Sequence, residues 1–202
     1  MLLTLPGCSS RSFSNHSDET RITVLEFADH TGSTVYLQSD IIRFATQVAV
    51  AAPPHTVIEA CTFGSDVQVA PFYTGKIRKP ILFKNALKAE LAKPSNGRGT
   101  FGAPLLRRVR ERLQQQGKPI LVIFVSDCGF DDLAEINAEA KLLAKEPNFI
   151  ALYGLPAVSD SSAYTKLEAA LKPLGNRVRL AASADAPEAI REIQAILRKG
   201  GK

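Results

Sequence analysis

The pattern of apolar and polar positions alternates along the chain between segments typical of strands and segments typical of helices. Short apolar runs, several of them rich in β-branched residues, predict strands over residues 21–29, 56–63, 119–126, 149–155 and 177–183. One of these runs, PILVIFVS, is apolar without interruption, as expected of a central strand buried on both faces. Strands that alternate with helices in this way favour a mostly parallel sheet.

Between the strand-like runs, apolar residues recur at the spacing of amphipathic helices. Such stripes predict helices within residues 35–50, 80–92, 105–113, 133–143, 164–171 and 190–197. Pro80 suits the first turn of its helix, because proline lacks the N–H that this position leaves unused. Asp132 and Glu135 have the spacing of a capping box, which predicts the start of the helix within residues 133–143.

One pair of expected strands breaks the alternation. A short turn at 64–66 separates the strand at 56–63 from a second run at 67–73, so we expect an antiparallel hairpin. Pro71 cannot donate to a strand ladder, which places the second strand at an edge. The predicted fold is α/β and Rossmann-like: a doubly wound, mostly parallel six-stranded sheet with one antiparallel edge strand and helices on both faces.

Length and charge narrow the classes of protein without naming a partner. The chain has 202 residues and 45% hydrophobic content, which favours one domain, and we assign it to residues 21–202. A formal net charge of +5 is too diffuse to demand nucleic acid. A cationic run predicts a solvated helix face, so no nucleic-acid partner is expected; it comprises Arg107, Arg108, Arg110 and Arg112.

Residues 1–20 differ from the rest of the chain. Their apolar part ends in LPGC and a serine-rich polar stretch follows, which resembles a bacterial lipoprotein signal with Cys8 as the lipidated residue. Only residues 1–6 precede this motif and no basic region does, so we interpret the segment as a truncated signal and polar tether. The expected location is the cell envelope, anchored by lipid; the alternative is a cytoplasmic protein. No apolar stretch reaches transmembrane length.

The most informative stretch, residues 21–35, is a strand that runs into a turn rich in oxygen. Asp29, Thr31 and Ser33 alternate there, and Gly32 lets the backbone turn sharply. Oxygen side chains at this spacing can converge on one small, hard cation. Local hydrogen bonds that stabilise a turn at a strand end are the alternative explanation, and this stretch leaves both open.

The pattern D-x-T-x-S resembles the first motif of the von Willebrand factor type A family, D-x-S-x-S, which opens a metal-ion-dependent adhesion site. Two later positions match that family in order: Thr100 in GRGT and Asp127 after the strand, in VSDCG. The chain departs from the family at Thr31, where serine is usual, and at Cys128, where a small residue is frequent. We interpret Cys128 as a small buried side chain.

The resemblance implies a strand order of 3-2-1-4-5-6, which would bring Asp29 and Asp127 together. It also implies a metal site for Mg²⁺ or Mn²⁺, with ligands Asp29, Thr31, Ser33, Thr100 and Asp127. An acidic residue of a protein partner would fill the open position on the ion, and the module would catalyse no reaction.

Three other features bear on this interpretation. A phosphotransferase or phosphohydrolase with Asp29 as nucleophile is the alternative function. Dehalogenase-type enzymes, however, use D-x-D at the strand end, and this chain has Thr31 at the second position. Three glycines match G-x-G-x-x-G but follow a helix instead of a strand, which excludes a dinucleotide fingerprint; they are Gly97, Gly99 and Gly102. His30 lies inside the first motif and is expected to be a rim residue of the metal site at most.

Overall fold

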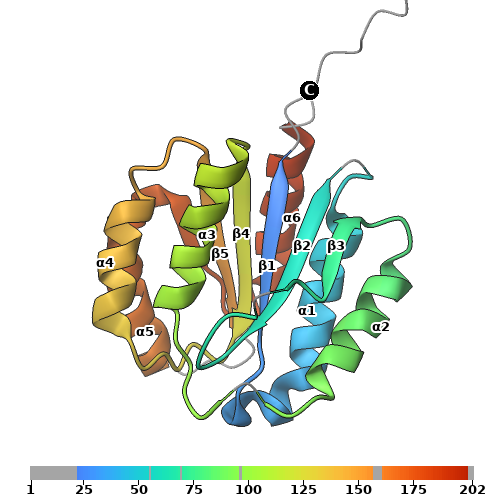
Figure 1. The fold of residues 1–202 in the computed structure, drawn as a ribbon, viewed down its shortest axis with the longest axis horizontal. Coiled ribbons are helices and arrows are strands. Elements are labelled where there is room, and N and C mark those ends of the chain that lie inside the picture. Colours follow the sequence, from blue (N-terminus) through green and yellow to red (C-terminus); the bar gives the residue numbers. More distant parts are fainter. Residues whose placement is uncertain (1–21, 55, 69, 96, 157–160, 200–202) are drawn as a thin grey trace, which may run out of the picture.

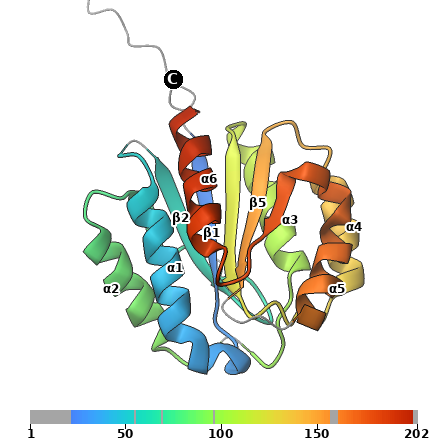
Figure 2. The ribbon, with the colours of Figure 1, turned by 180° about the vertical axis from the view of Figure 1, so that it is seen from behind.

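A sheet runs through the middle of the structure and helices cover both of its faces (Figure 1; Figure 2). The computed structural model describes residues 22–54, 56–68, 70–95, 97–156 and 161–199. The truncated signal and tether predicted for residues 1–20 lie outside the described residues. Within them the sheet has six strands in the order β3-β2-β1-β4-β5-β6, as expected.

All neighbouring strands are parallel except β2 and β3, which pair antiparallel at one edge. The strands are β1 (Thr23–Asp29), β2 (Val57–Phe63), β3 (Tyr73–Lys76), β4 (Ile120–Ser126), β5 (Phe149–Pro156) and β6 (Val178–Leu180). The helices are α1 (Gln38–Ala51), α2 (Pro80–Leu91), α3 (Ala103–Gln116), α4 (Leu133–Leu143), α5 (Ser161–Leu171) and α6 (Ala186–Lys199), with 3-10 helices η1 (Gly32–Leu37) and η2 (Lys172–Arg177). The predicted fold class is therefore confirmed.

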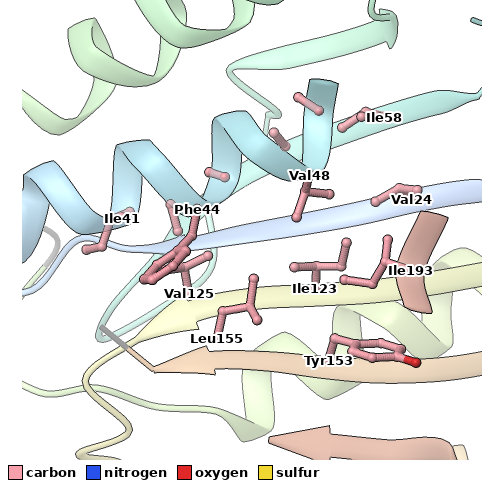
Figure 3. Packing of buried hydrophobic residues seen from close by; sticks show 14 of the residues in the cluster. Val24, Ile41, Phe44, Val48, Ile58, Ile123, Val125, Tyr153, Leu155 and Ile193 are labelled. Atoms are coloured by element: carbon pink, nitrogen blue, oxygen red, sulfur yellow. The ribbon is translucent and has the colours of Figure 1, made fainter. Parts of the chain in front are cut away.

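The helices form two layers, one on each face of the sheet. Helices α1, α2 and α6 pack on one face, and α3, α4 and α5 pack on the other. Figure 3 shows the first core, in which Phe44 and Val48 of α1 lie against the sheet. Because β1 and β4 are buried on both faces, alternate residues of each strand enter opposite cores. None of the helices in the described ranges is long and apolar enough to cross a membrane.

The edge strand begins later than the sequence pattern predicted. The expected strand at 67–73 was wrong in its bounds, since β3 starts at Tyr73 and Val67 makes only an isolated bridge with Phe63. Pro71 has no N–H to donate, so a regular ladder cannot run through it. Phe72 then donates to the carbonyl of Ala60, where the pairing resumes.

The capping box predicted at Asp132 and Glu135 is also wrong. Asp132 precedes α4 but makes no side-chain hydrogen bond to it. Its two carboxylate oxygens accept hydrogen bonds of 2.8 Å from the backbone N–H groups of Gly102 and Ala103, where α3 begins. These N–H groups have no partner within their own helix, and the positive end of the helix dipole favours a carboxylate there. Asp132 thus caps a neighbouring helix.

Glu26 is a buried acid in the middle of β1, and its residue is 2% exposed. Neither carboxylate oxygen has a hydrogen-bond partner within the described part of the chain. Burial penalises the charged form, so it raises the pKa of Glu26 well above its ordinary value of 4.5. Burial therefore favours the neutral, protonated form of Glu26 in the folded protein.

Candidate metal centre

The carboxyl ends of β1 and β4 lie side by side at the border of the sheet that is formed by the strand ends. This edge is the lower one in Figure 1. Asp29 is the last residue of β1, and Asp127 follows the last residue of β4. Because these two strands are parallel neighbours, their ends place both carboxylates at the same edge. This confirms the expectation that the strand order brings Asp29 and Asp127 together.

Asp29 is completely buried and its two oxygens have different partners. Oδ1 accepts hydrogen bonds from the hydroxyl of Thr31 at 2.8 Å and from its backbone N–H at 3.1 Å. Oδ2 accepts a hydrogen bond of 2.6 Å from the hydroxyl of Ser126. Burial raises the pKa of Asp29 to about 6, and the charge of Asp127 adds to the rise, while the bonds from Ser126 and Thr31 oppose it.

Three hydroxyl groups gather beside this carboxylate. The Thr31 hydroxyl lies 3.1 Å from the hydroxyl oxygen of Ser33 and accepts a hydrogen bond of 3.4 Å from Thr100. Adjacent ligands of an octahedral ion with metal–oxygen distances of about 2.1 Å lie about 3.0 Å apart. The spacing of these oxygens therefore fits a small, hard cation, and so does the chemistry of the donors.

Asp127 faces the same cavity as the hydroxyl groups. The cavity has a volume of about 550 Å³ and its lining includes Thr31, Ser33, Thr100 and Asp127. Asp127 is half-buried, and its Oδ1 accepts a hydrogen bond of 3.0 Å from the N–H of Gly129. The sequence-predicted residues thus share one cavity, except Asp29, which lies behind Thr31 and contacts it directly.

Among the described residues, no group of three or more His, Cys, Asp or Glu side chains is placed to hold a metal ion. Only two carboxylates, Asp29 and Asp127, belong to the predicted ligand set. An ion at this edge would depend on hydroxyl oxygens as well, so the affinity would rest on their placement.

Two residues that sequence reasoning missed position the predicted ones. Ser126 joins Asp29 to β4, and Asp131 accepts a hydrogen bond of 3.0 Å from the N–H of Thr100. Asp131 also lines the cavity and donates its own N–H to the carbonyl of Thr100. The sequence carried one signal for Ser126, a hydroxyl residue directly before Asp127 at the strand end.

Cys128 is the small buried side chain that was predicted. It is 2% exposed, and burial is the main reason that its thiol pKa rises to about 12. Its φ of 65° lies in the left-handed region, which explains why a small residue suits this position. The N–H of Cys128 donates to the Ser126 hydroxyl at 3.0 Å, so this turn also orients Ser126 toward Asp29.

His30, expected to be a rim residue at most, is not among the residues that line the cavity. Its side chain is buried, and its Nε2 lies 3.1 Å from the carbonyl oxygen of Lys93. Successive residues along a strand point to opposite faces of the sheet. The side chain of His30 therefore points away from the side that Asp29 occupies. His30 therefore fastens the strand end to the segment that follows α2.

Most of the arginine run is engaged in ion pairs within the protein. Arg107 and Arg110 pair with Glu139 at 3.1 and 3.2 Å, and Arg112 pairs with the buried Glu59 at 2.5 Å. These arginines bind α3 to its neighbours. Arg107 is exposed, as the sequence pattern predicted, whereas Arg110 and Arg112 are half-buried.

The geometry of Asp29 argues against its use as a nucleophile. Its carboxylate is fully buried and both oxygens already accept hydrogen bonds. A nucleophile needs a lone pair directed at a substrate. The phosphotransferase alternative therefore has no support from the site.

The fold and this edge of the sheet define an α/β protein with oxygen donors at the carboxyl ends of its central strands. Solved structures of the same fold include an aerotolerance-related membrane protein from Bacteroides fragilis, with 13% identity over 88% of this chain and 99% of that chain, at a TM-score of 0.62. A von Willebrand factor type A protein from Catenulispora acidiphila has 13% identity over 87% of this chain and 42% of that chain, with a TM-score of 0.62.

The manganese-loaded TRAP protein of Plasmodium vivax has 15% identity over 89% of this chain and 74% of that chain, with a TM-score of 0.61. No protein-family model matches the sequence, and no curated protein matches it either. The identities are low, so these similarities establish the fold alone. The chain has the von Willebrand factor type A fold.

Proposed function

We propose that this protein is a metal-ion-dependent interaction module that binds an acidic residue of a protein partner. The observation that carries the proposal is the chain of oxygen atoms from Asp29 through Thr31 to Ser33 and Thr100. Asp127 shares their cavity. The proposed ion is Mg²⁺, or Mn²⁺, which suits the same oxygen ligands.

Several residues of this chain would together hold the ion. The hydroxyls of Thr31, Ser33 and Thr100 would bind it directly, while Asp29 and Asp127 would supply negative charge, directly or through water. Ser126 and the Thr31 N–H keep the Asp29 carboxylate in place. When bound, the ion would supply a positive charge with an open position for a carboxylate. A manganese-loaded protein among those of similar fold supports this choice of metal.

The same geometry supports binding without catalysis. A general base must lie within hydrogen-bond reach of the proton that it removes. Asp29 is buried behind Thr31, and the thiol pKa of Cys128, at about 12, keeps that group protonated. Asp127 lines the cavity, but its charge would be engaged by the proposed ion. We therefore propose that the site binds its partner and releases it unchanged.

Thermal melting of the purified protein tests the metal site. An ion that binds only the folded protein stabilises it by mass action, so Mg²⁺ should raise the Tm and EDTA should reverse the rise. Asp29→Ala should remove the response, whereas Glu168→Ala, which removes an exposed carboxylate on α5, should keep it. A wild-type Tm that stays constant through millimolar Mg²⁺ would contradict the proposal.

Capture of a partner tests the docking role. A partner recovered on the immobilised protein in Mg²⁺ should be lost in EDTA and lost again with Thr100→Ala, because both changes disturb the same ion. Glu168→Ala should recover the partner normally. Retention in EDTA would mean that docking does not use the metal.

We also propose attachment to the cell envelope through a lipid on Cys8, which lies outside the described residues. The LPGC motif and the serine-rich stretch behind it support this placement. A protein of similar fold that is described as an aerotolerance-related membrane protein is in keeping with it. The gene should be expressed with its upstream sequence and the product partitioned between detergent and water. Cys8→Ala should move the protein to the aqueous phase, and an aqueous wild-type protein would overturn the proposal.

A further inference from the structure

The glycines around Arg98 have a structural explanation that does not involve a nucleotide. Gly97 has a φ of 87°, and a Cβ atom there would lie 1.9 Å from the hydroxyl oxygen of Ser65. A Cβ on Gly99 would lie 2.6 Å from the Phe101 ring. Side chains therefore do not fit on either side of Arg98 without a shift of the neighbours.

The loop that carries Arg98 is anchored at the side toward α3. Phe101 donates a backbone hydrogen bond of 2.9 Å to the carbonyl of Gly64, and Thr100 donates one of 3.0 Å to Asp131. The close approach of Gly97 and Gly99 to Ser65 and Phe101 adds contacts before that point. Arg98 is thus an exposed residue of a loop whose backbone is held from several sides.

Arg98 lines the same cavity as Thr100 and Asp127. It has no ion pair and no hydrogen bond to another residue in the described part of the chain. Arg107, Arg110 and Arg112, by contrast, pair with glutamates. The guanidinium of Arg98 therefore remains available to a group that enters the cavity.

The charges around the cavity indicate what Arg98 contributes to binding. Asp29, Asp127 and Asp131 carry three negative charges when ionised, and a divalent ion would offset two of them. The remaining negative charge opposes the entry of a carboxylate. Arg98 is the one cationic side chain among the described residues that line the cavity, and its positive charge favours the entry of an acidic group.

We propose that Arg98 binds a second carboxylate beside the one on the metal, so that the partner presents two adjacent acidic residues. This inference rests on the proposed function. The planar guanidinium offers two parallel N–H groups to a carboxylate, which a lysine ammonium does not. The loop holds this group at the cavity while the ion takes the first acid.

Binding of two short capped peptides tests the inference. Acetyl-Gly-Asp-Asp-Gly-amide carries the acidic pair, and acetyl-Gly-Asp-Asn-Gly-amide keeps one acid at the same length. Both would be titrated by NMR into the full chain in Mg²⁺. We expect the wild type to bind the paired peptide about tenfold more tightly, as a charge-assisted hydrogen-bond pair implies. Arg98→Ala should bind the two peptides equally, and Arg98→Lys should restore only part of the preference.

Lys118→Ala is the matched control, since it removes one exposed positive charge just before β4, at the opposite edge of the sheet. It should keep the tenfold preference. The Mg²⁺ rise in Tm should be the same in wild type and in Arg98→Ala. Equal binding of both peptides by the wild type, with a normal Mg²⁺ response, overturns this inference alone. A wild-type Tm that does not respond to Mg²⁺ overturns the proposed function and, with it, the placement of the first acid.

Discussion

The hydroxyl of Ser126 donates a hydrogen bond of 2.6 Å to Oδ2 of Asp29, which links the ends of the two central strands. Both groups are completely buried. A buried hydrogen bond to a carboxylate stabilises the fold more than an exposed one, because water cannot replace the lost partner. This hydrogen bond therefore stabilises the sheet and also holds Asp29 of the candidate metal centre in place.

Ser126→Ala should lower the free energy of unfolding by about 2 kcal/mol, because Oδ2 of Asp29 loses its partner. Urea denaturation at pH 7 measures this change. Ser33→Ala is the matched control, since Ser33 is an exposed hydroxyl of the same site. It should change the free energy of unfolding by less than about 0.5 kcal/mol and weaken the Mg²⁺ response. Equal stability losses in the two variants would contradict the assignment.

Replacement of Cys128 tests the left-handed backbone. Cys128→Gly should be more stable than Cys128→Ala by about 1 kcal/mol, because only glycine adopts a positive φ without steric cost. The comparison is informative because glycine is normally the more destabilising of the two. Denaturation of both variants under one set of conditions gives the difference. A more stable alanine variant would show that the backbone is not strained there.

Glu26 predicts a stability that falls as the pH rises. Its folded-state pKa lies well above the ordinary 4.5, so between the two values the unfolded chain releases a proton that the folded protein retains. This loss of folding stability is absent below the pKa that Glu26 has in the unfolded chain. It grows by at most about 1.4 kcal/mol per pH unit until the folded pKa is passed. Glu26→Gln removes this titration.

Urea unfolding of wild type and Glu26→Gln from pH 4 to pH 8 measures the effect. The stability of Glu26→Gln relative to wild type should increase with pH, while Glu168→Gln, an exposed control, should track the wild type. Glu26→Leu should be more stable than wild type at pH 7, because it removes an unpaired buried acid. A difference that does not change with pH would mean that Glu26 keeps its ordinary pKa.

Asp132→Ala should destabilise the protein by about 2 kcal/mol, because two N–H groups at the start of α3 lose their acceptor. Glu135→Ala is the control, since the capping box that would have involved it does not form. It should cost less than about 0.5 kcal/mol. Thermal melting of both variants shows whether Asp132 caps α3 or α4. A larger loss of stability in Glu135→Ala than in Asp132→Ala would support the capping box on α4 instead.

The order and kind of most helices and strands follow from local patterns in the sequence. The continuous apolar run of β4 and the helical stripe of Phe83, Leu87 and Leu91 depend on local side-chain periodicity, which neighbouring residues alone set. The resemblance to a known family then added the strand order and the set of candidate ligands. These residues lie at strand ends and in turns, where the chain pattern already concentrates polar groups.

Which side chains meet depends on how distant segments pack in the folded protein. Asp132 serves a helix about thirty residues before it in the chain, and Ser126 reaches Asp29 across 97 positions. His30 and Glu26 are buried because helices cover the sheet, although a polar residue in a strand gives no sign of its depth. Hydrogen-bond partners and burial depend on contacts between distant segments, and the alternation of apolar and polar positions does not encode those contacts.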